Sequence, residues 1–209
     1  MSILTDFFSS AIYWFYGLTG DWGLAIICIA AALRFLLLPI TLRQKKDMNK
    51  TRELAAKSNI IREKYKNNKK KLDQELAKLY QSGGMNSLGF FLLIMQLPIV
   101  WAVYQVINGI PYEAASVVLP WIASLSLPDP IWIVPILAVL AQVLPQLLSL
   151  FKGFNGLSPG KPSVAQMALI AGISLVFITR LPAAIALYWF SSAIVSTAQE
   201  LIVFYVEKG

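Results

Sequence analysis

The chain has 209 residues, of which 57% are hydrophobic and 14% charged, with a mean hydropathy of +0.63 and a net charge of +7. Soluble domains carry about 25% charged residues, so this composition is typical of a membrane protein. Because the chain has no histidine and one cysteine, Cys28, it excludes His-based triads, His-liganded metal sites, imidazole acid–base chemistry and an internal disulfide.

The N-terminal segment is apolar and aromatic but lacks the pattern of a cleaved signal. Residues 1–20 contain no Lys or Arg and carry Asp6, whereas a secretory signal begins with a positive region. We expect residues 3–17 to form an amphipathic helix that lies in the membrane interface. The alternative is an ordered extension of the first span.

Long apolar runs predict an all-α, polytopic membrane protein with five transmembrane helices. Each run is close to the roughly 20 residues that cross ~30 Å of hydrocarbon, and none alternates with the period of a strand. The fourth run is short for a span. The predicted organisation is an interfacial helix at 1–20, spans at 21–42, 86–107, 131–151, 164–181 and 182–206, a cytoplasmic antiparallel helical hairpin at 43–85, an extracytoplasmic loop at 108–130, a cytoplasmic loop at 152–163 and a cytoplasmic tail at 207–209.

The distribution of positive charge predicts the orientation. Residues 43–85 hold 13 of the 18 Lys and Arg residues against five Asp and Glu residues, and loops rich in Lys and Arg stay in the cytoplasm. The N-terminus is therefore expected outside and the C-terminus in the cytoplasm. Arg180 is the one basic residue that this topology leaves on the outer side.

The basic segment has the pattern of two helices separated by a turn. Apolar residues recur at helical spacing before and after residues 66–69, and an antiparallel hairpin buries both stripes. Its outer charges are either a solvated surface that enforces the orientation, or a docking surface for anionic headgroups or for a ribosome and its nascent chain. The candidate contact residues are Lys64, Lys66, Lys69, Lys70 and Lys71.

Arg34 is the most informative residue, because it lies near the middle of the first apolar run. It is the twelfth residue from Gly23, roughly 17 Å along a helix, where an arginine costs about 2.5–3.5 kcal/mol. Helical side chains lean toward the helix N-terminus, here away from the nearer cytoplasmic surface. Pro39 loosens the helix beside it. Since Glu200 lies near the cytoplasmic end of its span, a water-filled cavity is favoured over an ion pair.

Polar residues of the other spans are predicted to line this cavity. Taken singly, such residues often do no more than join neighbouring helices, through hydrogen bonds that each stabilise the packing by about 0.6 kcal/mol. Together with an intramembrane arginine, their one-sided spacing favours a hydrated groove. The candidates are Gln96 on the second span, Gln142 and Gln146 on the third, and Trp189, Ser192, Ser196 and Gln199 on the last.

Several of these segments resemble the YidC/Oxa/Alb family of membrane protein insertases, in its short, Gram-positive-like bacterial form. The segments are ALRFLLLPIT (32–41), the charged hairpin, QLPI (96–99) and LPAAIALYWFSSAIVSTAQ (181–199). The resemblance implies five spans around a groove that is open to the cytoplasm and lipid and closed outside. It also implies that the arginine, here Arg34, attracts acidic or polar client segments, without a cofactor, a metal or enzymatic catalysis.

The resemblance implies newly made membrane proteins as clients, with the Sec translocon and the ribosome as further candidate partners. A monomer in the bacterial cytoplasmic membrane is expected, with no nucleic-acid specificity. Compared with some members, we expect no lipoprotein-type signal, no large extracytoplasmic domain and no long basic tail, which leaves ribosome dependence open. A small anion transporter or channel is the alternative. An intramembrane enzyme is disfavoured, because the spans lack histidine and paired aspartates.

Overall fold

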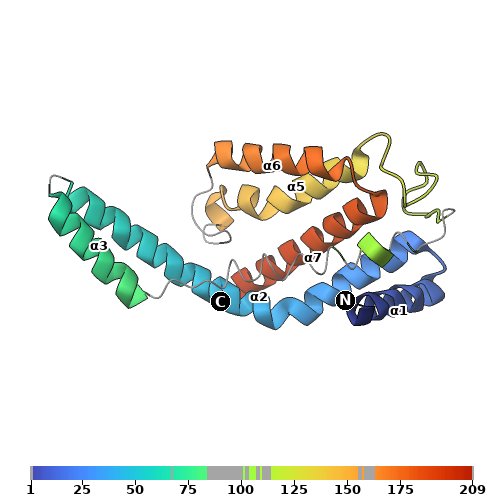
Figure 1. Cartoon of the computed structure of the whole chain (residues 1–209), viewed down its shortest axis with the longest axis horizontal. Helices are drawn as coiled ribbons and strands as arrows, with labels where there is room; N and C mark the ends of the chain where they lie inside the picture. The colour runs from blue at the N-terminus through green and yellow to red at the C-terminus, as the bar shows by residue number, and fades with distance from the viewer. Residues whose placement is uncertain are drawn as a thin grey trace. The chain divides into compact units, whose positions relative to one another are not determined.

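The computed structural model describes residues 2–66, 68–83, 101, 104–106, 109, 114–154, 157 and 163–208. Within these residues the regular structure is helical, which confirms the predicted class. The chain divides into two compact units, Met1–Leu36 with Leu97–Gly209, and Leu37–Gln96. The helices are α1 (Ser2–Thr19), α2 (Trp22–Lys64), α3 (Lys69–Gly83), α5 (Ile133–Leu148), the 3-10 helix η1 (Lys152–Phe154), α6 (Val164–Ile178) and α7 (Ala183–Lys208) (Figure 1).

Among the described residues, two helices are long and apolar enough to cross a membrane. They are Trp22–Arg43, with 22 residues and a mean hydropathy of 2.4, and Ala183–Val206, with 24 residues and 1.2; they match the first and last predicted spans. Helices α5 and α6 are also apolar but have 16 and 15 residues. The second predicted span, 86–107, lies almost wholly outside the described residues, so the count of five stays a prediction.

Small residues allow the helices of the first unit to pack closely. Ala25 and Ala30 of α2, and Ala183, Ala184 and Ala186 of α7, are all 0% exposed. Backbones approach one another closely where side chains are this small, which is how helices gain packing contacts in a membrane. Helix α5 packs against both α6 and α7.

Helix α1 presents two different faces. Phe8 and Ile12 are buried in the core, where they line one small cavity together with Ile26 and Ile29 of α2. Phe7 and Trp14 are about 60% exposed. One face of the helix is therefore buried and the other carries exposed aromatic side chains; its amphipathic character and its place in a membrane interface stay predictions.

Residues 114–132, the capping segment, contact the N-terminus of α2. The Asp21 carboxylate accepts hydrogen bonds from the Leu24 N–H (2.8 Å), the Val117 N–H (2.7 Å) and the Ser116 hydroxyl (2.7 Å). Burial alone would raise the pKa of Asp21, but these donors outweigh it and lower the pKa below the ordinary 3.8. Gly23 is required at this contact, because a Cβ there would overlap the Ser116 hydroxyl.

The same segment also caps α7. The N–H of Ala183 donates to the Leu127 carbonyl (2.8 Å), and the N–H of Ala184 donates to the Leu125 carbonyl (3.0 Å). These are first-turn N–H groups, which have no partner within their own helix. The capping segment therefore joins the N-termini of two helices that are far apart in the sequence.

A buried carboxylate organises the end of the capping segment. Asp129, 2% exposed, accepts hydrogen bonds from the Trp121 indole (3.2 Å) and from the backbone N–H groups of Ile131 (3.1 Å) and Val134 (2.8 Å). This arrangement holds Trp132 in the left-handed region, with φ 61°, a conformation that costs a bulky residue about 1–2 kcal/mol. The turn leads directly into α5.

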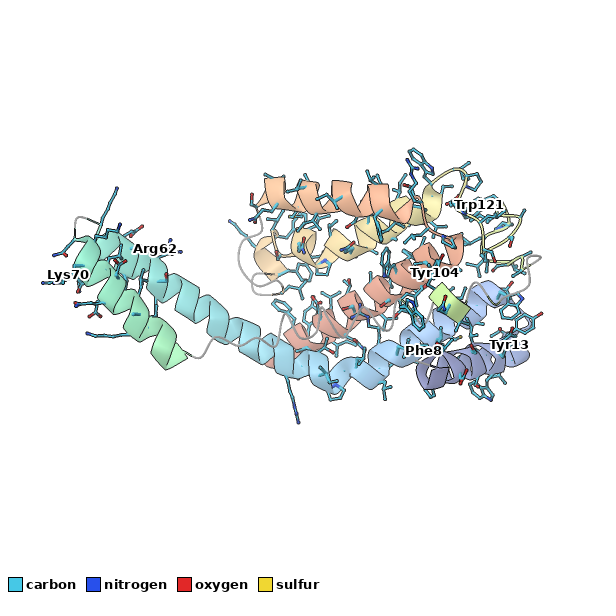
Figure 2. The ribbon with its side chains drawn as sticks, viewed as in Figure 1. Phe8, Tyr13, Arg62, Lys70, Tyr104 and Trp121 are labelled. Carbon is cyan, nitrogen blue, oxygen red and sulfur yellow. The ribbon has the colours of Figure 1, made fainter. Side chains whose placement is uncertain are left out.

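The second unit contains the C-terminal part of α2, a short turn and α3. Helix α2 continues through Pro39 to Lys64. The predicted boundary between the first span and the hairpin, at residue 42, therefore lies inside one continuous helix. The chain turns at Tyr65, whose carbonyl accepts from the Asn68 N–H (2.9 Å), where the sequence predicted a break. Figure 2 draws Arg62 and Lys70 projecting from the two helices.

Candidate functional site

Arg34 reaches from α2 to two serines of α7. Its Nε–H donates to Ser192 Oγ at 2.7 Å, and an Nη1–H donates to Ser196 Oγ at 3.4 Å. Arg34 lies about 18 Å along α2 from Trp22 at 1.5 Å per residue, slightly more than half of a ~30 Å hydrocarbon core. The two serines are one helical turn apart, so they lie on the same face of α7.

A second contact ties α7 to the backbone at this point. The Gln199 side-chain amide donates to the Arg34 carbonyl at 3.2 Å. The next carbonyl along the chain, that of Phe35, is the one that Pro39 leaves without its helical donor. Arg34 is therefore held by its side chain and its backbone, on the turn of α2 where the helical hydrogen bonding is interrupted.

The partners of Arg34 leave much of its hydrogen-bonding capacity free. A guanidinium has five N–H donors, and in the described part of the chain two of them bond to protein atoms. Ser192 and Ser196 are neutral, so they orient the positive charge without cancelling it. Tyr188 and Glu200 are close enough to interact with Arg34 electrostatically. The Glu200 carboxylate therefore compensates part of this positive charge.

Tyr188 is a member of this cluster that the sequence analysis did not assign. It is 3% exposed, and its side chain lies close to Ser192, which is itself bonded to Arg34. Its spacing of four residues from Ser192 could have indicated the contact. Ser191 and Thr197, also buried, instead donate to carbonyls of their own helix at 2.8 and 2.9 Å.

The other predicted groove residues are not joined to Arg34 in the described part. Trp189 is half-buried, and its ring lies 6.2 Å from that of Phe177 on α6. Gln142 is exposed and Gln146 is half-buried on α5, and no hydrogen bond between either side chain and Arg34 is among the described contacts. Gln96 lies outside the described residues. The structure thus brings together Arg34, Ser192, Ser196 and Gln199.

The predicted hairpin contacts are all exposed. Lys64, Lys66, Lys69, Lys70 and Lys71 face solvent, whereas the apolar positions of the same unit are half-buried, namely Ile61, Tyr65, Leu72, Leu76 and Leu79. This pattern of exposure is expected if the apolar stripes of the two helices pack against each other and the lysines point outward. The lysines remain available to a partner or to solvent.

Comparison with known proteins identifies the family. A family model described as "60Kd inner membrane protein" matches residues 14–208. The chain belongs to this family. The match confirms the predicted membership in the YidC/Oxa family and covers α2, α3, α5, α6 and α7 completely.

Curated relatives of the chain carry the name "Membrane protein insertase YidC". One from Wolinella succinogenes is 34% identical over 91% of this chain and 35% of the relative. One from Campylobacter jejuni is 33% identical over 88% of this chain and 34% of the relative. One from Helicobacter pylori is 31% identical over 96% of this chain and 37% of the relative. The chain spans about a third of the length of these relatives.

Proposed function

We propose that this chain inserts membrane proteins into the bacterial inner membrane, as a multi-pass protein with five spans. Its clients are newly made membrane proteins, and it works without catalysis or a cofactor. Family membership and the names of the relatives support insertion, and no comparison favours the alternative of an anion transporter. The Sec translocon and the ribosome stay candidate partners.

The observation that carries the proposal is the cluster around Arg34. Its hydrogen bonds to the neutral Ser192 and Ser196 leave a positive charge able to attract the acidic tail of a client. A hydrophilic groove at this depth, open to cytoplasm and lipid, shortens the apolar distance that such a tail must cross, which is ~30 Å in an undisturbed bilayer. Burial of the client's apolar helix then supplies the free energy of insertion.

The remaining parts of the chain have assigned roles in this proposal. The N-terminus lies outside and the C-terminus in the cytoplasm, because the hairpin is strongly basic. Helix α1 lies in the membrane interface with Phe7 and Trp14 toward lipid. The hairpin lysines receive clients, Gln96, Gln142, Gln146 and Trp189 line the groove with α7, and the protein acts as a monomer.

The test is insertion of a single-span client with an acidic N-terminal tail into proteoliposomes that contain only this protein. We expect wild type and Arg34→Lys to insert the client, and Arg34→Ala to fail. Arg62→Ala, which removes an exposed arginine of the hairpin, is the matched control and should insert normally. If Arg34→Ala inserts as well as wild type, attraction by the arginine is not the mechanism for that client.

A further inference from the structure

Glu200 is an acidic residue of α7 that the proposed function does not yet use. It is half-buried, and it directly follows Gln199, whose side-chain amide donates to the Arg34 carbonyl at 3.2 Å. It also lies four residues after Ser196, whose hydroxyl accepts from the Arg34 guanidinium at 3.4 Å. Residues four apart lie on the same face of a helix. Glu200 therefore belongs to the part of α7 that holds Arg34.

The positions of these residues along α7 bring the carboxylate toward the guanidinium. Helix α7 begins at Ala183, and at 1.5 Å per residue Ser192 and Ser196 lie about 14 and 20 Å from that start. Glu200 lies about 6 Å beyond Ser196. Because helical side chains lean toward the N-terminus of their helix, the Glu200 side chain leans back toward Arg34. The two charges interact electrostatically, although the sequence alone disfavoured such a pair.

The hydrogen bonds of Arg34 allow its anionic partner to be exchanged. Two neutral hydroxyls, of Ser192 and Ser196, hold the guanidinium at 2.7 and 3.4 Å. A guanidinium has five N–H donors, so these bonds leave donors for a carboxylate. The serines keep Arg34 in place when the carboxylate of Glu200 is replaced by one from a client. An entering carboxylate therefore competes with Glu200 for the same positive charge.

We propose that Glu200 is an internal competitor of acidic client segments for Arg34, and that it sets how acidic a segment must be to bind. This role rests on the proposed insertase function. A client carboxylate replaces the attraction between Glu200 and Arg34 with its own, so one acid gains little net attraction. Several acids outweigh the single carboxylate of α7, and a neutral segment gains nothing from Arg34. Glu200 is thus a specificity-determining residue that rejects weakly acidic segments.

The test is photocrosslinking of single-span clients to the full chain in proteoliposomes of phosphatidylcholine, a zwitterionic lipid that adds no net charge. The clients have zero, one or three aspartates in otherwise identical N-terminal tails that carry the photoreactive group. Glu200→Gln should lower the half-saturating concentration of the one-aspartate client about ten-fold, within the range of couplings between two binding groups. It should change binding of the three-aspartate client less, and that of the neutral client not at all. Glu200→Asp, which keeps the charge, should stay closer to wild type.

Two variants separate competition at Arg34 from other effects of charge. Asp6→Asn removes one negative charge from an exposed position of α1 and should bind all three clients like wild type. Arg34→Gln should abolish the dependence on aspartates, and adding Glu200→Gln to it should then change nothing.

The outcomes distinguish this proposal from the function on which it rests. If wild type and Arg34→Gln crosslink all three clients alike, attraction by Arg34 is wrong, and competition by Glu200 is wrong with it. If binding depends on aspartates and on Arg34 but Glu200→Gln behaves like wild type, only the competition is overturned. Weaker crosslinking of every client to Glu200→Gln would identify a structural carboxylate and also overturn it. An equal gain with Asp6→Asn would mean that total charge decides.

Discussion

Ser192→Ala tests whether α7 positions the guanidinium of Arg34. The Ser192 hydroxyl is 3% exposed and accepts the Nε–H at 2.7 Å. Alanine removes this acceptor and leaves the charged Nε–H without its partner on α7. A neutral hydrogen bond between membrane helices contributes about 0.6 kcal/mol, and a bond to a charged group about 1.5–3 kcal/mol. We expect a loss of about 1.5 kcal/mol of stability.

The neighbouring Ser191 provides the control. It is 6% exposed, but its hydroxyl donates to the Leu187 carbonyl of its own helix and makes no described contact with Arg34. Ser191→Ala should therefore cost less than about 0.6 kcal/mol, although it deletes the same atoms. Ser196→Ala should fall between the two, because its bond to Arg34 is longer, at 3.4 Å.

Two assays separate positioning from stability. The free energy of unfolding in detergent gives the stability loss, and a double-mutant cycle of Ser192→Ala with Arg34→Met isolates the interaction between the two side chains. Insertion of an acidic-tailed client is then measured at a temperature where every variant is folded. We expect insertion to fall about ten-fold with Ser192→Ala, the equivalent of about 1.4 kcal/mol. Equal behaviour of Ser192→Ala and Ser191→Ala, or a coupling near zero, would refute the reasoning.

Three further predictions concern other parts of the chain. Asp21→Asn should lower stability by about 1–2 kcal/mol at pH 7. Because the folded pKa of Asp21 is depressed below 3.8, this stabilisation is full above pH 3.8 and is lost as the pH falls through the folded pKa. Melting curves of wild type and variant should therefore converge in acid, and exposed Asp6→Asn is the control that should melt like wild type at pH 7. Gly23→Ala should destabilise the protein by about 1–3 kcal/mol, because the new Cβ overlaps the capping segment. Gly17→Ala, with open space around it, should instead stabilise the protein by about 0.5–1 kcal/mol. Equal melting temperatures of the two variants would contradict the contact between Gly23 and the capping segment. Reversal of Lys69, Lys70 and Lys71 to Glu should weaken insertion at normal expression, and unchanged insertion would identify them as a solvated surface.

The sequence was sufficient to predict the helical class, and it singled out Arg34, whose function stays a prediction. Runs of apolar residues have the length of a span whatever their neighbours are, and one charge inside such a run is conspicuous. The spacing of Ser192, Ser196 and Gln199 placed them on one face of a helix, and the structure sets that face against Arg34. Their role as a groove for clients stays a prediction.

The capping segment could not be predicted, because its contacts follow no repeat. No pattern in the sequence marked Asp21 or Asp129, although both are buried acceptors of several hydrogen bonds. The requirement for glycine at position 23 depends on Ser116, which is far away in the sequence. Similarly, the spacing of Gln142 and Gln146 fixes their separation on α5 but not which neighbour they face.

The link between Arg34 and Ser192 has a consequence for how the chain itself is made. The two residues are 158 positions apart, so a ribosome working at about 5–20 residues per second needs roughly 8–30 s to reach the serine after the arginine. During that interval the first span carries its arginine without the hydroxyls that later hold it, at an insertion cost of about 2.5–3.5 kcal/mol. The first span is therefore a demanding segment to integrate, and the hydroxyl that completes its environment follows only 158 residues later.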